Sequence, residues 1–371
     1  MKSYAQINLN NLANNTKAIK DWVNDSEIMA IVKADAYGHG ALQCSKTVIE
    51  NGASSLGVAT INEAMELREA GIKAPILILT HILAEDYEKA IDNDIAITVS
   101  RFEQGIEIQQ ASIKLKKPAK IQVKVNSGLN RNGFRPDEDT AREIIMLGTA
   151  KNIIVEGIYS HLSDVRDKDF VINQQKRFEF ITMNAEHYFS FKKHISASSA
   201  ILEYPELNYD IVRPGLILYG INPTDTNIKL LNLKPVMSLY SEISHIHKVP
   251  AGESIGYERS FFTNRDTMAA IVPIGYADGY PSTLSNNARV TINDKSCMVL
   301  GKVCMDQIII DVTDVFEEKN ESWKKAEVTL IGGEGKGKIK IEELANNSSL
   351  GIRELLCLRS SKRVPRIFVN S

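Results

Sequence analysis

The 371-residue sequence predicts an α/β fold, with an N-terminal (β/α)8 TIM barrel followed by a mostly β C-terminal domain. Three observations predict it. The length exceeds that of one small domain, eight apolar runs alternate with helix-like segments, and the pattern changes near residue 232. We expect one domain over residues 10–232 and a second over residues 233–371, which the first strand, residues 1–9, joins.

Short runs of apolar residues with high β propensity recur through the first 215 residues, and segments with helical periodicity separate them. In residues 62–71, for example, Ala64, Leu67 and Ala70 repeat at helical spacing before Gly71 ends the helix. Such alternation favours a parallel sheet, and eight strands indicate a barrel, although the count alone also allows an open sheet. The predicted strands are Glu27–Val32, Ser55–Ala59, Ile76–Leu79, Ile95–Val99, Lys120–Val125, Val155–Tyr159, His194–Ala197 and Asp210–Arg213.

Beyond residue 232, apolar and polar residues alternate, and Gly, Pro and Asn-Asp turns interrupt them. This pattern is typical of antiparallel strands with one buried face. The opening SYAQINLN alternates in the same way, which is why we assign it to the β domain. No low-complexity tract or flexible linker separates the two halves, so we expect them to be firmly packed domains.

Composition excludes several classes of partner. A formal net charge of -2 provides no global attraction to nucleic acid or anionic membranes. The sequence contains neither an apolar run of 18 residues nor the core of a signal peptide. Cys44, Cys297, Cys304 and Cys357 lack metal-ligand spacing, and the histidines of HIHK have no third ligand nearby. We therefore expect a cytoplasmic protein without metal or disulfides.

Polar residues follow five of the eight predicted strands at their C-terminal ends. In a TIM barrel, active sites are built at this end of the strands. A lysine, two arginines and a histidine that converge on one face are difficult to explain as solvent-exposed surface alone. The candidates are Lys33 after the first strand, Asn126 and Arg131 after the fifth, His161 after the sixth, Ser199 after the seventh and Arg213 at the end of the eighth.

The segment VRPGLILYG, residues 212–220, follows the last predicted strand. Barrels often bind phosphate in the loops after strands seven and eight, where backbone N–H groups at a helix start meet an anion. Ser199, Gly215 and Leu216 lie in these loops, although RPG taken by itself is more typical of a plain turn. A strand-end lysine beside a phosphate site suggests pyridoxal 5′-phosphate (PLP), because lysine forms a Schiff base with it and the phosphate anchors it.

The motif VKADAYGHG, residues 32–40, resembles the cofactor-lysine signature of alanine racemases. Other blocks of that family follow in order over nearly the whole chain: KVNSGLNRNGF, VEGIYSHLSD, SASSA, IVRPGLILYG, SIGYERS, VPIGYADGY, VLGKVCMDQIIIDV and RVPRIF. The resemblance implies a PLP-dependent isomerase that interconverts L- and D-alanine. It also implies a barrel with a C-terminal β domain, assembled as a head-to-tail homodimer with shared active sites.

The resemblance assigns two catalytic bases, Lys33, which also carries PLP, and Tyr257 of the partner subunit. Two are needed because racemisation removes a proton from one face of Cα and returns one to the other. Arg213 matches the arginine at the pyridine nitrogen, and a guanidinium that stays protonated makes the ring a weaker electron sink. His161 matches the histidine that links Tyr257 to Arg213.

The remaining matches concern substrate, cofactor and support. Arg131 matches the arginine near the cofactor phenolate and the substrate carboxylate, and Lys124 matches a lysine that is often carbamylated and braces that arginine. Met305 matches a residue that donates a backbone N–H to the substrate carboxylate across the dimer, and Tyr276 one that lines the entrance. The phosphate contacts of the family correspond to Tyr37, Ser199, Gly215 and Leu216.

The sequence departs from the family pattern at three places. Asn126 replaces a carboxylate, and Ser198 stands where the usual block has asparagine. Many members carry a tyrosine just before RVPR, where this chain has Ser360, Ser361 or Lys362. A lost ring would leave room for a hydroxymethyl group, so a serine or alanine/serine racemase of the same fold is the alternative.

Two rival functions belong to other classes. A PLP-binding homeostasis protein would be a single barrel, so a second domain carrying Tyr257 counts against it. A barrel-fold PLP decarboxylase of basic amino acids would need a carboxylate at the pyridine nitrogen, and Arg213 counts against that.

Overall fold

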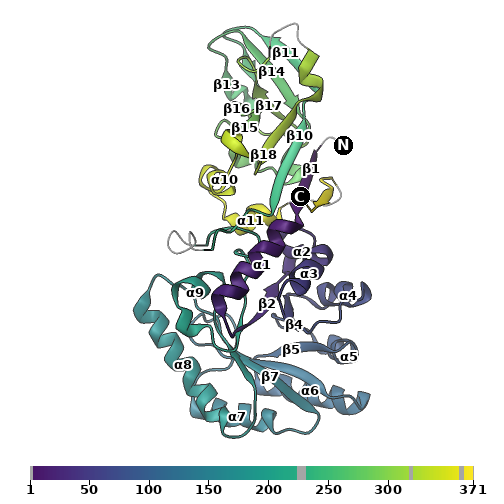
Figure 1. Ribbon diagram of the computed structural model, residues 1–371, viewed down its shortest axis with the longest axis vertical. Helices are drawn as coiled ribbons and strands as arrows, with labels where there is room; N and C mark the ends of the chain where they lie inside the picture. The colour runs from purple at the N-terminus through teal and green to yellow at the C-terminus, as the bar shows by residue number, and fades with distance from the viewer. Residues whose placement is uncertain (1–2, 224–230, 317–320, 359–362, 371) are drawn as a thin grey trace. The chain divides into compact units, whose positions relative to one another are not determined.

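The computed structural model describes residues 3–223, 231–316, 321–358 and 363–370, and the chain divides into two compact units (Figure 1). The first unit comprises residues 11–36 and 40–234, and the second comprises residues 1–10, 37–39 and 235–371. No helix within the described ranges is long and apolar enough to cross a membrane.

The first unit is a nearly closed barrel of eight parallel strands in the order β8-β7-β6-β5-β4-β3-β2-β9. A bridge between Ala197 and Arg213 connects the two end strands just beyond their C-terminal ends. The predicted barrel is therefore confirmed. Its strands are β2 (Glu27–Ile31), β3 (Ser55–Val58), β4 (Ile76–Ile78), β5 (Ile95–Val99), β6 (Ala119–Lys124), β7 (Ile153–Tyr159), β8 (Lys192–His194) and β9 (Ile211–Val212).

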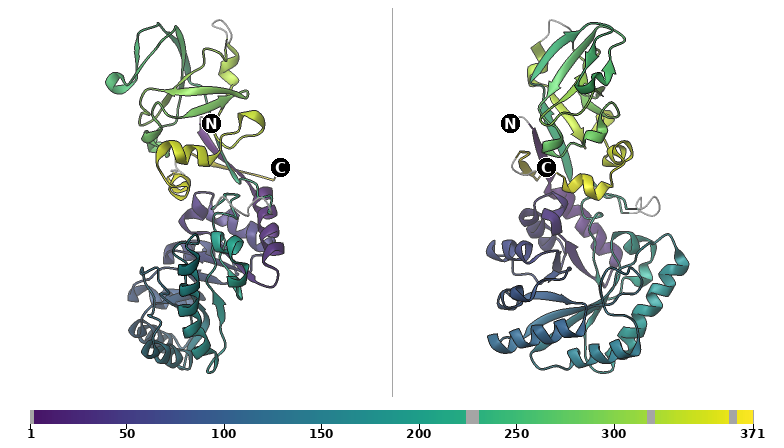
Figure 2. Two further views of the ribbon diagram at one scale, coloured as in Figure 1. Left: turned by 90° about the vertical axis from the view of Figure 1, so that its left-hand side faces the viewer. Right: turned by 180° about the vertical axis from the view of Figure 1, so that it is seen from behind.

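Helices surround the barrel strands, as Figures 1 and 2 show. Because helices cover the outside and side chains fill the inside, strands such as β5 are buried along their whole length. Side-chain caps begin several helices; Asp137 caps α7 and Asp167 caps α8. The helices are α1 (Leu9–Val23), α3 (Ala41–Glu50), α4 (Ile61–Glu69), α5 (Tyr87–Asp92), α6 (Phe102–Leu115), α7 (Glu138–Gly148), α8 (Lys168–Glu186) and α9 (Ser198–Glu203).

The second unit is built on a nine-stranded sheet in the order β11-β14-β17-β16-β15-β18-β10-β1-β19. Strand β1 (Ser3–Asn8) pairs antiparallel with β10 and parallel with β19. The prediction of a mostly β second part is confirmed. The other elements are β10 (Met237–Glu242), β11 (His245–Val249), β12 (Ser254–Ile255), β13 (Phe261–Phe262), β14 (Thr267–Val272), β15 (Arg289–Ile292), β16 (Lys295–Leu300), β17 (Ile308–Asp311), β18 (Glu327–Ile331), α10 (Ile341–Ser348), α11 (Ile352–Cys357) and β19 (Arg366–Val369).

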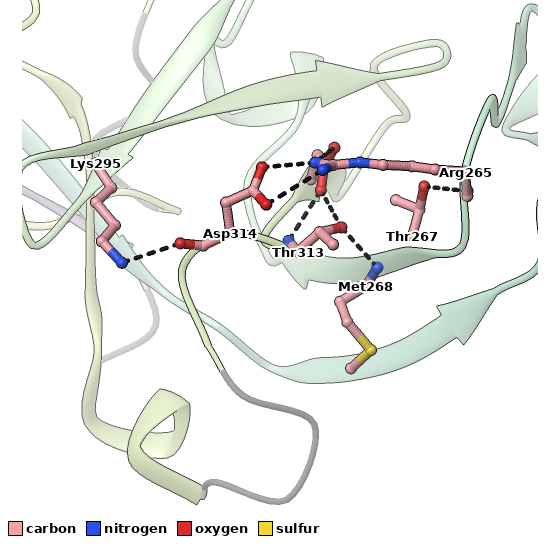
Figure 3. Close-up of polar contacts among 7 residues, drawn as sticks. Arg265, Thr267, Met268, Lys295, Thr313 and Asp314 are labelled. Carbon is pink, nitrogen blue, oxygen red and sulfur yellow. Dashed lines mark hydrogen bonds and ion pairs between the residues drawn. The ribbon is translucent and has the colours of Figure 1, made fainter.

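A polar cluster joins β14 to the turn after β17 (Figure 3). Arg265 Nη2 donates to Asp314 Oδ2 over 2.7 Å, and Lys295 Nζ donates to the Asp314 carbonyl over 3.0 Å. The backbone N–H of Met268 donates to Thr313 Oγ1 over 3.0 Å. The side chains of Arg265 and Asp314 are exposed, so solvent screens this ion pair and it contributes little to stability.

Candidate active site

Lys33 follows β2, and the backbone after it takes an unusual conformation. Ala34, Asp35 and Ala36 have φ of 51°, 52° and 54° and ψ of 49°, 48° and 48°. The element labelled α2 (Lys33–Tyr37) is therefore a turn of left-handed helix. A left-handed conformation costs about 1–2 kcal/mol for each residue that carries a Cβ. The candidate catalytic lysine thus precedes a strained segment that surrounding bonds must hold in place.

Arg213 is buried, only 4% exposed, and hydrogen bonds fix its guanidinium. Nη2 donates to the carbonyls of Ser160 over 2.6 Å and Ile195 over 2.9 Å, and Nη1 donates to His194 Nδ1 over 2.7 Å. Burial lowers the pKa of Arg213 to about 10, so the group stays protonated at neutral pH. These three acceptors are neutral, so among the residues that the structure describes Arg213 is a rigid hydrogen-bond donor and not half of an ion pair.

The bond to Arg213 determines the tautomer of His194. A guanidinium can only donate, so His194 Nδ1 accepts and the proton lies on Nε2, which donates to Gln122 Oε1 over 2.8 Å. Burial, with a further contribution from Arg213, lowers the pKa of His194 well below its usual value. Gly157 lies beside this bond, because a Cβ there would come within 3.2 Å of His194 Nε2 and 3.3 Å of Gln122 Oε1. In the hydrogen-bond chain Gln122–His194–Arg213, Gln122 and His194 are therefore neutral and only Arg213 is charged.

His161 follows β7 and meets the same arginine, with His161 Nδ1 3.4 Å from Arg213 Nη2. Burial lowers the pKa of His161 to about 3, and Arg213, Arg131, Lys124 and Lys33 contribute to that lowering in that order. His161 is consequently neutral at physiological pH. With Nδ1 facing a donor, its proton lies on Nε2, which is then available to a further acceptor.

Positive charge accumulates at this end of the barrel. Lys124 is buried at the end of β6, and burial, then Arg131, Arg213 and Lys33, lower its pKa to about 8. The charged groups that act on Lys124 and His161 are all cations. Like charges gathered in a poorly solvated site favour the binding of an anion. PLP and an amino acid bring a phosphate, a phenolate and a carboxylate, so this set of donors fits PLP.

The loops expected to bind phosphate contact one another. Ser198 Oγ accepts a hydrogen bond from the backbone N–H of Gly215 over 2.9 Å, which joins the start of α9 to the turn after β9. Ser199 is half-buried in the first turn of α9, and Leu216 is buried in the turn after β9. The departure at Ser198 therefore has a structural role, since its short side chain connects the two loops.

The other departure in the barrel shapes the loop of Arg131. Asn126 Oδ1 accepts from the backbone N–H of Asn130 over 2.9 Å, and Asn126 Nδ2 donates to Asn130 Oδ1 over 3.1 Å. A neutral amide thus holds the loop at this departure from the family pattern. Arg131 itself is exposed.

Three predicted site residues lie in the second unit and are exposed there. The exposed fractions are 68% for Tyr257, 52% for Met305 and 48% for Tyr276. The backbone N–H of Tyr276 donates to the Cys304 carbonyl over 3.1 Å, and that of Ala277 donates to the Met305 carbonyl over 3.0 Å. The loops of Tyr276 and Met305 therefore form one surface.

Gly275 and Arg363 hold these two loops together. A Cβ on Gly275 would lie 2.3 Å from the Cys304 carbonyl oxygen, so only glycine allows the loops to approach. Arg363, the first residue of RVPR, donates to Asp278 Oδ1 over 2.7 Å and to Asp306 Oδ1 over 2.6 Å. The RVPR motif thus bridges the Tyr276 turn and the Met305 loop.

Tyr37 belongs to the second unit, where burial raises its pKa and nearby Arg353 opposes that rise. The structure therefore groups Lys33, Lys124, Arg131, His161 and Arg213 in one unit and Tyr37, Tyr257, Tyr276 and Met305 in the other. The predicted replacements for the missing tyrosine, Ser360, Ser361 and Lys362, lie outside the described residues.

Sequence reasoning missed His194 and Gln122, which orient Arg213. Both lie in predicted strands of a buried sheet, and a signal was available: Gln122 stands between the apolar Ile121 and Val123, and His194 directly precedes Ile195. Ser198 was recognised only as a departure, without its bond to Gly215.

Two family models match the chain. The alanine racemase N-terminal domain matches residues 7–223, and the alanine racemase C-terminal domain matches residues 236–368. The chain belongs to the alanine racemase family. Members of this family are PLP-dependent isomerases.

Relatives in the alanine racemase family match end to end. An alanine racemase of Clostridium novyi is 40% identical over 99% of this chain and 95% of its own length. One of Methanococcus maripaludis is 40% identical over 99% of this chain and 98% of its own length. The solved structure of an alanine racemase of Clostridium difficile 630 superposes with a TM-score of 0.93 at 35% identity, covering 100% of this chain and 96% of that one.

Proposed function

We propose that this chain interconverts L- and D-alanine, using PLP bound by the barrel domain, residues 10–232, and a base from the β domain, residues 233–371 with the first strand. The observation that carries the proposal is the cationic barrel end, where Lys33 accompanies a buried Arg213 that neutral acceptors hold. Relatives named alanine racemase over the full length support alanine as the substrate.

Residues of the chain that carries Lys33 would hold PLP. Lys33 would bind it covalently, Arg213 would donate to its pyridine nitrogen, and Ser199, Gly215, Leu216 and Tyr37 would bind its phosphate. PLP, when bound, withdraws electrons from the amino acid and acidifies its Cα–H bond. Because Arg213 keeps its proton, the ring remains a moderate electron sink, which favours return of the proton to Cα over side reactions.

Two bases on opposite faces of Cα carry out the proton transfers. Lys33 serves one face, and Tyr257 of the partner subunit serves the other. His161, neutral and protonated on Nε2, would donate to the oxygen of that tyrosine and so stabilise its deprotonated form. Because His161 Nδ1 faces Arg213, Nε2 is the nitrogen that would donate to Tyr257.

The substrate carboxylate would meet charge and a backbone donor. Arg131 would bind it from the barrel, and the backbone N–H of Met305 would bind it from the partner subunit, with Tyr276 lining the entrance. Lys124 would brace Arg131. Its pKa of about 8 leaves a fraction of neutral amine at physiological pH, which is the form that reacts with CO2 to give a carbamate.

A homodimer follows from this assignment, because Tyr257, Tyr276 and Met305 are exposed in the single chain and would complete the site of a partner. We infer a cytoplasmic enzyme that supplies D-alanine for the cell wall. The spacing of the four cysteines, which fits neither a metal site nor a disulfide framework, supports a reducing compartment.

The test follows solvent deuterium into Cα of L- and D-alanine with the purified PLP-loaded enzyme. Lys33→Ala and Tyr257→Phe variants should each be inactive in racemisation, whereas a mixture of the two should regain activity because mixed dimers contain one intact site. A mixture as inactive as its components would refute the shared site.

A serine or alanine/serine racemase is the second candidate, since the chain has no tyrosine just before RVPR. A kcat/KM for L-serine orders of magnitude below that for L-alanine would eliminate it. Comparable values would make this the better description.

A further inference from the structure

Glu63 joins three backbone amides from two neighbouring loops of the barrel. Its Oε1 accepts from the N–H of Ala34 over 2.8 Å. Its Oε2 accepts from the N–H of Ala59 over 2.7 Å and from that of Thr60 over 3.2 Å. Ala59 and Thr60 follow β3, whereas Ala34 comes directly after Lys33, which follows β2. One carboxylate therefore ties the residue next to Lys33 to the end of the adjacent strand.

Only part of this bonding serves helix α4. Thr60 is the N-cap, and its Oγ1 accepts from the N–H of Glu63 over 3.2 Å while Glu63 returns a bond to the N–H of Thr60. This reciprocal pair is a complete capping box. The bond from Glu63 to Ala34 adds nothing to the capping of α4, so it needs another explanation.

The bond to Ala34 acts on the backbone of Lys33. The N–H of Ala34 belongs to the peptide group that Lys33 and Ala34 share, so an acceptor on that N–H fixes ψ of Lys33. The residues that follow are in the left-handed conformation, which L-residues avoid. Asp35 supports the far side of the turn, because its Oδ1 accepts from the N–H of Ala41 over 2.7 Å. Without Glu63, the near side would lose its side-chain acceptor.

We propose that Glu63 is a positioning residue for Lys33, whose carboxylate holds the Lys33–Ala34 peptide group at the start of the left-handed turn and thereby directs the lysine side chain. The inference rests on the proposed function, in which Lys33 carries PLP and moves the proton. Glu63 acts through the backbone and touches neither substrate nor cofactor.

The test compares Glu63→Ala with Thr60→Ala, which weakens the same capping box but leaves the carboxylate, and with Glu66→Ala on the same helix. We measure kcat and KM for both alanine enantiomers, the pH titration of the visible absorbance of the PLP-loaded enzyme, and hydrogen exchange of residues 33–37. Glu63→Ala should lower kcat about tenfold or more, move the titration midpoint and speed exchange. Both controls should match the wild type in kcat and titration, even where Thr60→Ala lowers thermal stability.

A second variant tests the strained turn itself. Ala34 is exposed, and glycine enters the left-handed region without steric cost. Ala34→Gly in the Glu63→Ala background should therefore restore kcat at least about threefold, while Ala34→Gly alone should leave it nearly unchanged. Rescue supports the role of Glu63, and absence of rescue contradicts a turn held against strain.

The outcomes separate this inference from the proposed function. If Lys33→Ala keeps wild-type exchange, the proposed function fails whatever Glu63 does. If activity depends on Lys33 but Glu63→Ala behaves like Thr60→Ala in kcat, titration and exchange, the positioning role alone is overturned.

Discussion

The two units present their candidate site residues in opposite ways. In the barrel, Arg213 and Lys124 are each only 4% exposed, and hydrogen bonds to buried partners fix Arg213. In the β unit, Tyr257 is 68% exposed and Met305 52%. The barrel thus provides a preorganised cationic site, whereas the β unit presents side chains on a surface. Substitutions in the buried barrel site should affect stability and activity together. Substitutions of the exposed side chains of the β unit should affect activity alone.

Lys33→Ala should have the largest effect, because it removes both the covalent attachment and one base. We expect kcat for either enantiomer to fall at least about 10⁴-fold. Lys176→Ala, at an exposed position of α8, is the matched control and should retain full activity. Deuterium exchange into both enantiomers provides the measurement, and wild-type exchange would contradict the assignment.

Tyr257→Phe should come next and should separate the two enantiomers. It removes the proton carrier on one face, so exchange from one enantiomer should fall about 10³-fold while the other is affected much less. Because the ring is exposed, the unfolding free energy should change by less than about 0.5 kcal/mol. Tyr188→Phe, an exposed tyrosine of the barrel unit, controls for the substitution. Equal losses for both enantiomers would undo the two-base assignment.

Lys124→Met tests the electrostatic cost within the barrel. The folded pKa of about 8 lies below the ordinary 10.5, so the unfolded chain binds more protons between these values and stability rises with pH across that window. Below pH 8, burying the charged Lys124 ammonium lowers the unfolding free energy by the full amount, about 3 kcal/mol. In CO2-free buffer the methionine variant should be more stable by up to that amount at pH 7, and the gain should vanish above pH 10.5. Denaturant unfolding measures it, and a gain independent of pH would contradict burial of the charge.

Gln122→Met should have the smallest effect of the four. It leaves the Nε2–H of buried His194 without its acceptor, so the unfolding free energy should fall by about 1–3 kcal/mol. Gln110→Met, at an exposed position of α6, should change it by less than about 0.5 kcal/mol. An equal effect of the two variants would argue against the Gln122–His194–Arg213 chain.

Much of the barrel and part of its site could be predicted from the sequence. Local β propensity and helical periodicity located seven of the barrel strands, whereas β8 (Lys192–His194) shares only His194 with its predicted strand, His194–Ala197. The rule that TIM-barrel sites lie at the C-terminal ends of strands selected Lys33, His161 and Arg213. Tyr257 could be proposed only by resemblance, because no local pattern relates it to a lysine more than two hundred residues earlier.

The remainder depended on contacts between distant segments. Gln122 lies on β6 and His194 on β8, and they meet because alternate strands of a barrel direct side chains into the same interior layer, with Gly157 of the intervening β7 leaving space. Glu63 belongs to the capping box of α4, which the local sequence can indicate. The residues around Glu63 in the sequence do not indicate that its Oε1 accepts from the N–H of Ala34.

The sequence by itself determined which elements form and which residue types gather at the strand ends, because hydrophobic periodicity and turn chemistry act over a few residues. The tertiary structure alone decided which donor faces which acceptor: the tautomer of His194, the neutrality of His161, the lowered pKa of Lys124 and the left-handed turn after Lys33. The tautomer and the pKa shifts arise from burial and from donors and charges brought together by barrel closure. The turn is bonded to the side chains of Glu63 and Asp35, and none of these contacts exists before the chain has folded.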